Sequence, residues 1–366
     1  MSLLEKIKKT WKANVMFVKK EYPTIDLLKF VFSILIVAIH TSLLKVNESY
    51  SAWMVSSLFF RLGVPFFFVV SGFFLSDKLY SIQNRNLVEC SQVTRKYCIK
   101  NLPPLILWGG IGLIFNLIEL QTKGQSISYL LAYSCRTFFY PLNAMWYLLA
   151  SIIGAIIMTI FYLKCKSWRW VWVVYAIVSY IFVLLCNNYF FLAEGTALEP
   201  LIRLYSKVFV SARNGVFLAP VYMGMGFVIR CDDAQAWFSK HKYVSVISLI
   251  CGFVFLTVEA TVLFGCTRYD DRGFFISQLL LIPSLVLVSM FYSTKMKLPY
   301  RLLRRLSTSV FYLHCTIRTV VQYFLRQNMV ETGDNIVLFV VTTLLTILIS
   351  LISYGMNNKK VSALFG

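Results

Sequence analysis

The sequence predicts an all-α integral membrane protein, a bundle of about ten transmembrane helices with both termini in the cytoplasm. The first observation behind this prediction is composition, because 58% of the 366 residues are hydrophobic and only 14% are charged. The second is that apolar stretches of about 20 residues, the length that crosses ~30 Å of hydrocarbon, recur along the whole chain. The third is the uneven distribution of Lys and Arg over the connecting segments, which sets the orientation.

The predicted spans are joined by short hydrophilic segments, of which the longest covers residues 77–100 and is too short to form a separate domain. We therefore expect one transmembrane domain at 23–358, preceded by an amphipathic basic helix at 1–22 and followed by a cytoplasmic tail at 359–366. The spans are predicted at residues 25–44, 54–76, 101–119, 144–163, 170–187, 213–229, 243–263, 274–293, 308–327 and 335–356.

Positive charge is concentrated on one set of connecting segments. With the N-terminus in the cytoplasm, the inner segments hold about 24 of the 36 Lys and Arg residues and the outer segments about 8. This orientation satisfies the positive-inside rule and is expected for a multi-pass protein of the cell membrane. The net charge of +20 is then explained by a cytoplasmic face beside anionic membrane lipid, without a nucleic-acid partner.

Residues 1–22 have the pattern of a helix that lies on the inner membrane surface. Lysines cover most of its polar side, and the apolar stretch and small-residue cleavage site of a signal peptide are absent. A docking surface for a soluble protein is the alternative role of such a helix. The apolar face consists of Leu4, Ile7, Trp11, Val15 and Val18.

The nine cysteines are scattered, and most lie inside or beside predicted spans. Neither CxxC pairs nor the Cys/His spacings of zinc ligands occur, so the sequence predicts no metal site and no disulfide framework. Walker, GxGxxG and GxSxG motifs are also absent from the sequence. We therefore expect no tightly bound cofactor.

The first span carries two ionisable residues, Lys29 and His40, in the stretch TIDLLKFVFSILIVAIH. Eleven residues make about 1100° of rotation, so both side chains share one helical face, and the axial rise separates them by ~16 Å. An ionisable side chain in a span is costly and by default indicates a functional site that faces the bundle interior. The structural alternatives are a lysine that extends to the inner headgroups and a neutral histidine that bonds another helix.

This stretch resembles the first helix of the membrane acyltransferase-3 family, whose hallmark is an Arg, then ten residues, then a His. Lys29 stands at the place of the Arg, and His40 matches the His. Further matches follow in the family's order between residues 25 and 320. They are RLGVPFFFVVSGFFL (61–75), the basic approach to LPP (Arg95, Lys96, Lys100, Pro103), MWYL (145–148), RNGVFLAPVYMGMGFVI (213–229) and SVFYLHCTIR (309–318).

Lys in place of Arg, together with IDLLKF and VPFFF, resembles the membrane module of the vancomycin-resistance serine racemases. That resemblance implies a role in antibiotic resistance. In those proteins a racemase-like domain that binds pyridoxal phosphate follows the membrane part. No such domain is present in the sequence up to Gly366, so we expect either a stand-alone protein or a module whose C-terminal racemase-like partner domain is missing.

The family resemblance implies an acyltransferase that uses an acyl-CoA as co-substrate, with acetyl-CoA entering from the cytoplasm. His40 is the expected catalytic residue, either as a general base or as a nucleophile that forms an acyl-imidazole. Candidate acids to orient it are Glu48, Glu119 and Glu259. The residues expected to bind the donor are Lys29, Arg61, Arg95, Lys96, Lys100 and His314, the last near the inner end of its span.

The acceptor is expected at the outer side of the membrane as a hydroxyl or amino compound, such as a cell-wall sugar, a lipid-linked sugar or an amino acid. Its recognition is expected to reside in the outer segments 120–143 and 187–212. The residues expected to contact the acceptor are Ser71, Asn143, Trp146, Tyr147, Arg213 and Asn214. For Trp146 and Tyr147, anchoring at the membrane interface is the alternative role.

A carrier for a small polar substrate such as serine is the alternative function, with Lys29 and His40 as proton or substrate sites. Prolines within or at the ends of spans, such as Pro65 and Pro220, would free backbone groups around a cavity in either case. No inverted repeat is detected between the two halves of the sequence, which favours the acyltransferase. A non-catalytic anchor or sensor is the third alternative, and the intramembrane His40 argues against it.

Overall fold

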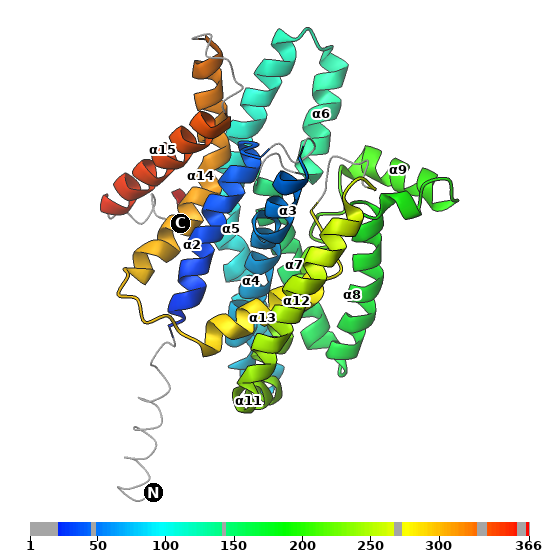
Figure 1. Cartoon of the computed structure of the whole chain (residues 1–366), viewed down its shortest axis with the longest axis vertical. Coiled ribbons are helices and arrows are strands. Elements are labelled where there is room, and N and C mark those ends of the chain that lie inside the picture. Colours follow the sequence, from blue (N-terminus) through cyan, green and yellow to red (C-terminus); the bar gives the residue numbers. More distant parts are fainter. Residues whose placement is uncertain are drawn as a thin grey trace, which may run out of the picture.

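Helices make up the regular structure of the protein in our computed structural model (Figure 1). The structure describes residues 21–44, 49–140, 144–266, 273–327, 335–356 and 364–365, and no strand occurs in these ranges. The helix predicted at 1–22 therefore falls almost entirely outside the described residues. The α-helices are α2 (Pro23–His40), α3 (Tyr50–Leu58), α4 (Gly63–Tyr80), α5 (Leu87–Thr122), α6 (Ile127–Phe139), α7 (Met145–Lys164), α8 (Trp168–Leu185), α9 (Leu198–Phe209), α10 (Ala219–Arg230), α11 (Asp232–Lys240), α12 (Lys242–Leu263), α13 (Gln278–Phe291), α14 (Tyr300–Gln327) and α15 (Asn335–Gly355).

Seven helical stretches in the described residues are long and apolar enough to cross a membrane, α3 and α4 counting as one. This agrees with the predicted helical integral membrane protein. The other three predicted spans coincide with α10, α13 and α14. Of these, α10 has 12 residues and α13 has 14, whereas α14 has 28 residues but carries several arginines. The number of spans and the cytoplasmic termini stay predictions.

Two of the predicted spans start later than expected because side chains hold the preceding backbone in turns. Before α10, the Oδ1 atom of Asn214 accepts hydrogen bonds from the amides of Val216 and Phe217 at 2.9 and 3.0 Å. Before α13, the amides of Ile276 and Ser277 are bonded to a side chain of α12. The apolar composition of these turns is that of a span, so the sequence does not distinguish them from helix.

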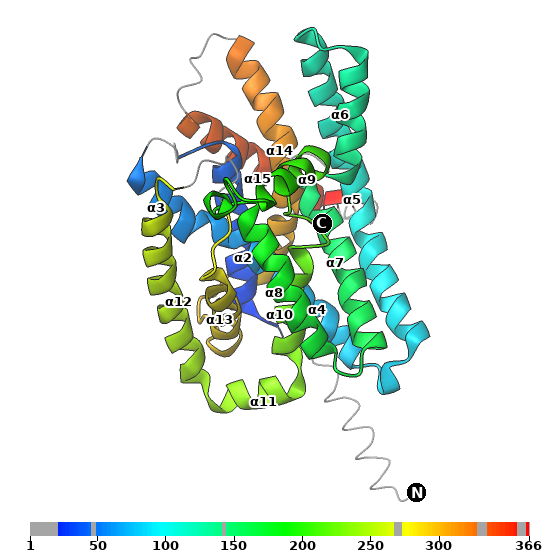
Figure 2. The ribbon, with the colours of Figure 1, turned by 90° about the vertical axis from the view of Figure 1, so that its right-hand side faces the viewer.

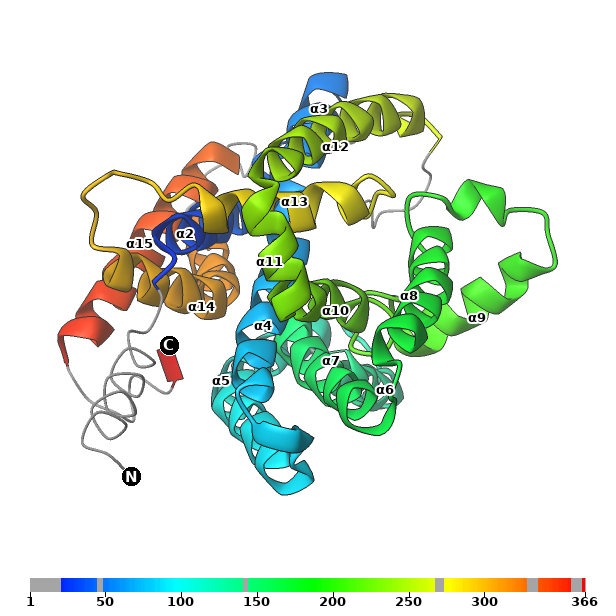
Figure 3. The same ribbon diagram turned by 90° about the horizontal axis from the view of Figure 1, so that it is seen from below.

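α2 and α14 lie side by side and are tied together near both ends of α2 (Figure 3). Near its start, Arg304 forms a bidentate ion pair with Asp26, with Nε–Oδ1 and Nη2–Oδ2 distances of 2.9 and 2.7 Å. Such charge-assisted pairs fix geometry as well as adding energy. At its end, Nη1 of Arg318 donates to the carbonyl oxygen of His40 at 2.8 Å. These contacts at the two ends of α2 fix the position of His40 relative to α14.

α4 and α10 are in direct backbone contact. A Cβ atom built on Gly72 of α4 would lie 2.1 Å from the carbonyl oxygen of Met223, and one on Gly226 of α10 would lie 2.1 Å from that of Val69. Small residues permit such an approach between membrane helices, because no side chain separates the two backbones. This helix pair forms the centre of the bundle.

α5 is one continuous 36-residue helix that contains both the predicted span 101–119 and the second half of the hydrophilic segment 77–100. Its first turn is capped by Asn86, whose Oδ1 accepts hydrogen bonds from two backbone amides. Lys96 and Lys100 therefore extend from the same helix as the span, and their positions relative to it are fixed by helical geometry.

Each of the two outer segments predicted to recognise the acceptor contains a helix (Figure 2). Segment 120–143 contains α6, and segment 187–212 contains α9. The two helices are connected, because Nη2 of Arg136 in α6 donates to the carbonyl oxygen of Ser206 in α9 at 3.1 Å. The two segments are thus in direct contact.

The predicted tail 359–366 is described only at Leu364 and Phe365, and these residues contact the bundle. Nε1 of Trp108 in α5 donates to the carbonyl oxygen of Leu364 at 3.0 Å. The Trp108 and Phe365 rings meet edge to face, with centroids 5.5 Å apart. At these two positions the chain packs against α5, a contact that the prediction of a cytoplasmic tail did not include.

Glu259 of α12 holds the start of α13. Its side chain is buried, and its Oε1 and Oε2 atoms accept hydrogen bonds from the amides of Ile276 and Ser277 at 2.6 and 2.8 Å. The Tyr189 hydroxyl donates to Oε1 as well. The carboxylate thus satisfies backbone donors that a helix start leaves without partners. It does not lie beside His40, so it is not the acid that the sequence left as a candidate partner.

Replacing Glu259 with alanine is expected to destabilise the protein by about 2–4 kcal/mol, because each buried donor left without an acceptor costs roughly 1–3 kcal/mol. Glu259→Gln, which keeps an acceptor oxygen, should lose less. The measurement is thermal unfolding of the purified protein in detergent. The control is Glu119→Ala, since that exposed carboxylate pairs with Lys123 on the surface and its loss should change stability little. Equal stability of the Glu259→Ala and Glu119→Ala variants would contradict the structural role of Glu259.

Candidate active site

A pocket of about 300 Å³ lies beside the end of α2 and contains the His40 side chain; we call it the His40 pocket. Its wall is mostly apolar and aromatic, with two arginines, and no Asp or Glu is among the described residues that line it. The lining residues are Ile36, Ile39, His40, Phe60, Arg61, Val64, Tyr140, Ala144, Trp146, Tyr147, Arg213, Gly273, Phe274 and Phe311.

A larger pocket of about 660 Å³ lies towards the start of α2; we call it the lysine pocket. Lys29 of α2, Lys78 of α4, and Lys96 and Lys100 of α5 contribute to its wall. No acidic residue is among its described lining residues. Its polar groups also include the side chains of Ser71, Ser81, Tyr97, Asn101, Ser151, Ser307 and Thr308.

The two pockets share a wall of aromatic side chains. Tyr147 of α7 and Phe311 of α14 line both pockets, and their ring centroids are 5.1 Å apart. The ring of Phe67 lies 6.2 Å from that of Tyr147 and 6.0 Å from that of Phe311. The Tyr147 hydroxyl is hydrogen-bonded to Ser71 Oγ at 3.2 Å. The pocket that contains the lysines and the pocket that contains His40 thus meet at these rings.

Cationic side chains surround His40. Arg61 precedes α4 and Arg213 precedes α10, and both line the His40 pocket. The Arg213 guanidinium lies over the Trp146 ring, 5.3 Å from its centroid, in a cation–π arrangement. Arg318 reaches the backbone of His40 from α14. Such a positive environment stabilises negative charge that develops on a substrate oxygen.

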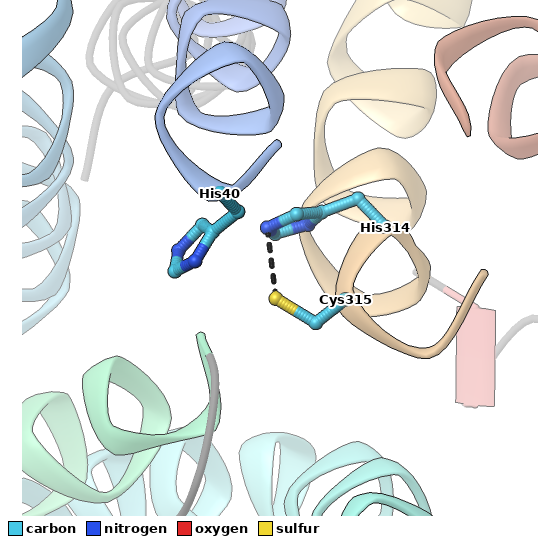
Figure 4. Close-up of side chains that lie close together, drawn as sticks. All are labelled: His40, His314 and Cys315. Carbon is cyan, nitrogen blue, oxygen red and sulfur yellow. Dashed lines mark hydrogen bonds between the residues drawn. The ribbon is translucent and has the colours of Figure 1, made fainter. Parts of the chain in front are cut away.

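His314 and Cys315 of α14 lie next to His40 (Figure 4). The His40 and His314 ring centroids are 5.1 Å apart, and His314 Nε2 is 3.2 Å from Cys315 Sγ. The sequence-based expectation put His314 near the inner end of its span, with the donor. The structure instead places it at the end of α2, because α14 begins at Tyr300, earlier than the predicted span. Sequence reasoning gave no role to Cys315.

The expected donor residues divide between the two pockets. Lys29, Lys96 and Lys100 line the lysine pocket, as does Lys78, which the sequence analysis did not single out. Arg61 lies in the His40 pocket instead. Arg95 is exposed and lines neither pocket, since it lies on another side of α5 than Lys96 and Lys100.

The expected acceptor residues are also divided. Trp146, Tyr147 and Arg213 line the His40 pocket, whereas Ser71 lines the lysine pocket. The Asn214 side chain lines neither, because its amide nitrogen donates to Tyr205 Oη at 2.6 Å and its oxygen caps the turn before α10. Asn143 lies outside the described residues. From the outer segment 120–143, Tyr140 reaches the pocket and stacks on Trp146 with centroids 6.0 Å apart.

None of the three candidate acids is seen against His40 in the described residues. Glu119 is exposed and pairs with Lys123 at 2.8 Å, Glu259 holds α13, and Glu48 lies outside the described ranges. The ligand-type atoms of His40, His314 and Cys315 do lie within 4.8 Å of one another. Ligand spacing along the chain did not indicate this group, since its members come from two helices that are far apart in sequence.

Comparisons with known proteins concern most of the chain. A family model described as "Acyltransferase domain", that of acyltransferase family 3, matches residues 22–355. The chain is similar to an amino-acid racemase of Enterococcus faecalis, with 28% identity over 63% of this chain and 31% of that protein. It is also similar to a serine/alanine racemase of Enterococcus gallinarum, with 25% identity over 88% of this chain and 44% of that protein. The chain thus spans less than half the length of these relatives, and no solved structure matches it.

Proposed function

The chain belongs to the acyltransferase-3 family, and from that premise we propose that it moves an acetyl group from cytoplasmic acetyl-CoA to a hydroxyl or amino acceptor at the outer side of the membrane. The observation that carries this proposal is the pair of pockets that meet at Tyr147 and Phe311. One pocket offers cations for phosphates, and the other offers a histidine for acyl chemistry. A donor that is charged at one end and reactive at the other fits this arrangement.

The lysine pocket suits the phosphate-bearing end of the donor. Lysine ammonium groups bind phosphates as point charges, and four of them line this pocket. Substitution of the family's Arg by Lys29 keeps the charge at that place but loses bidentate geometry. The slender pantetheine arm would then extend past Tyr147 and Phe311 towards His40. The offset of ~16 Å along α2 between Lys29 and His40 matches the use of a long, flexible arm.

The His40 pocket suits the transfer itself. We propose that the His40 imidazole accepts the proton of the acceptor's hydroxyl or amino group during its attack on the acyl carbon. Arg61 and Arg213, which line the same pocket, would stabilise the negative charge on the carbonyl oxygen. An acyl-imidazole on His40 is the alternative route. The aromatic side chains Tyr140 and Trp146 would contact the acceptor.

The relatives' names suggest a context for the acceptor. The similar proteins are named amino-acid and serine/alanine racemases, and this chain covers less than half of their length. We propose that the membrane domain works beside a racemase-like domain and that an amino acid is among the acceptors to test first. A carrier for such an amino acid is the second candidate function, since two pockets that meet at shared aromatic residues also suit alternating access.

The test is release of free CoA from acetyl-CoA by the purified full chain in lipid nanodiscs, with binding of acetyl-CoA measured in parallel. Binding together with CoA release, accelerated by an added acceptor, would support the acyltransferase. A folded protein that neither binds acetyl-CoA nor releases CoA would contradict it. In that case, serine uptake into proteoliposomes without any dependence on acetyl-CoA would favour the carrier.

Removing two charges from the lysine pocket is expected to weaken donor binding selectively. The Lys96→Gln/Lys100→Gln double variant should raise the KM for acetyl-CoA about tenfold or more, which corresponds to ~1.4 kcal/mol. The kcat should change little, because both residues line the pocket that does not contain His40. Arg95→Gln is the matched control, since Arg95 lies on the same helix but lines neither pocket. An equal rise of KM in the control would show that general surface charge, rather than this pocket, attracts the donor.

A further inference from the structure

His314 and Cys315 form a hydrogen-bonded pair within reach of His40, and the proposed function assigns them no task. Both side chains are buried, with exposed fractions of 0% and 3%. The distance from His314 Nε2 to Cys315 Sγ is 3.2 Å, and the reactive atoms of both residues and of His40 lie within 4.8 Å of one another (Figure 4). His40 lines the pocket in which the acyl group is proposed to react. The thiol is therefore close to the reacting centre.

The backbone of α14 determines which ring nitrogen of His314 faces the thiol as a base. His314 Nδ1 lies 2.9 Å from the carbonyl oxygen of Val310. A carbonyl oxygen only accepts hydrogen bonds, so Nδ1 carries the proton. The Nε2 atom of the neutral ring then has a free lone pair, and the Cys315 S–H group is the donor in the bond to it. A thiol that donates to an imidazole held by a third group is the arrangement of an activated nucleophile.

Two other cysteine thiols, just after the ends of α10 and α12, make a different contact. The thiol of Cys231 lies 3.4 Å from the carbonyl oxygen four residues earlier, and that of Cys266 makes the same kind of bond to Val262. Such bonds occupy the S–H group in local structure. In Cys315 the S–H group is directed to a base instead. A divalent metal ion is a poorer occupant of the cluster, since Arg318 lies one helical turn after His314 and is bonded to His40.

We propose that Cys315 is the nucleophile that takes the acyl group from the donor, so that the reaction passes through an S-acyl cysteine. This inference rests on the proposed function. In the first step, the Sγ–carbon bond forms and the bond between the acyl carbon and the CoA sulfur breaks. The thiol proton passes through His314 Nε2 to the CoA sulfur, and CoA leaves with a free thiol. One thioester replaces another, so no further reactant is consumed.

In the second step, the acceptor oxygen or nitrogen attacks the acyl carbon held on Cys315. The bond from this carbon to Sγ breaks, the acceptor's proton goes to His40, and a proton returns to the Cys315 sulfur through the adjacent imidazoles. His40 and His314 thus serve different halves of the reaction. The acyl group stays on the His40 side of the aromatic wall after CoA has left the lysine pocket, so donor and acceptor need not be bound at the same time.

The experiment uses the full chain in nanodiscs with acetyl-CoA labelled in the acetyl group and with no acceptor. After rapid quenching and denaturation, we expect close to one label per protein, released by neutral hydroxylamine and located by mass spectrometry on the peptide that contains Cys315. Cys315→Ala should lose this label while still binding acetyl-CoA. The matched control is Cys186→Ala, because Cys186 is also buried but does not belong to the group formed by His40, His314 and Cys315, and it should keep the label.

The outcomes separate this inference from the proposed function. His314→Gln should slow formation of the label about 10²-fold, as expected for loss of a general base. Wild-type protein that turns over acetyl-CoA but carries no hydroxylamine-sensitive label, or that carries it on His40, overturns the acyl-cysteine and leaves the acyltransferase intact. Undiminished turnover of acetyl-CoA by the Cys315→Ala variant would likewise overturn the acyl-cysteine and leave the acyltransferase intact. Protein that neither binds acetyl-CoA nor releases CoA overturns both.

Discussion

Replacing His40 with alanine is expected to lower the steady-state turnover of acetyl-CoA at least ~10²-fold, the usual contribution of a positioned general base. The affinity for acetyl-CoA should change little. His40 lines the smaller pocket, whereas the four lysines line the other, and the aromatic wall lies between them. We therefore expect a loss in kcat with a nearly constant dissociation constant for the donor. The two quantities are measured by release of CoA and by calorimetric titration of the same preparation.

The control for this prediction is His241→Ala. His241 is half-buried between α11 and α12 and lines neither pocket. Its ring is bonded to the carbonyl oxygen of Trp237 in the preceding helix, so its loss should leave turnover unchanged. Wild-type turnover in His40→Ala would place the reacting centre outside the His40 pocket. A rise of KM at constant kcat would instead make His40 a binding residue.

Gly226→Ala is expected to destabilise the helix bundle strongly, although it adds only one methyl group. The added Cβ would lie 2.1 Å from the carbonyl oxygen of Val69 in α4, a distance that real Cβ atoms do not reach. Overpacking costs ~1–3 kcal/mol where side chains can move aside. Here the obstacle is backbone, so α4 and α10 must separate and the expected loss is about 3 kcal/mol or more. Gly72→Ala should behave alike, because its Cβ would meet the backbone of Met223.

The measurement is the yield of monodisperse protein in detergent and its apparent melting temperature. Gly110→Ala is the control, since a Cβ at this position of α5 meets nothing within 4 Å. Alanine favours helix over glycine by roughly 1 kcal/mol, so this control should be neutral or slightly stabilising. Equal melting temperatures for Gly226→Ala and Gly110→Ala would contradict the direct contact of the two backbones.

The helical membrane fold follows from the sequence because a span needs only length and apolar composition, both of which are local properties. The starts of α10 and α13 do not follow, because they depend on hydrogen bonds made by Asn214 and Glu259 to backbone amides. Glu259 acts from another helix, so no window of sequence around α13 contains the cause. The contact of Leu364 with Trp108 is of the same kind, since it joins residues far apart in the chain.

In the candidate site too, relations within one helix follow from the sequence, whereas relations between helices do not. Lys29 and His40 were correctly predicted to occupy one helix at two different depths, because helical geometry alone relates them. The pocket beside which Arg61, Ser71 and His314 lie did not follow from the sequence, because the depth of one helix relative to another is set by packing. The ion pair of Asp26 with Arg304 and the bond of Arg318 to His40 set the height of α14 against α2. The stretch SVFYLHCTIR shows that His314 and Cys315 are neighbours in the chain. Only the structure shows that His40 of α2 lies beside them.

The aromatic wall of Tyr147 and Phe311 has a consequence for the membrane as a barrier. A continuous polar pore through a bilayer would leak protons and ions, and on the proposed function the rings shared by the two pockets would close the path between them. On the proposed function, only the small acyl group and the tip of the carrier arm pass this layer. The cell would thus export activated two-carbon units while its nucleotide cofactor never leaves the cytoplasm.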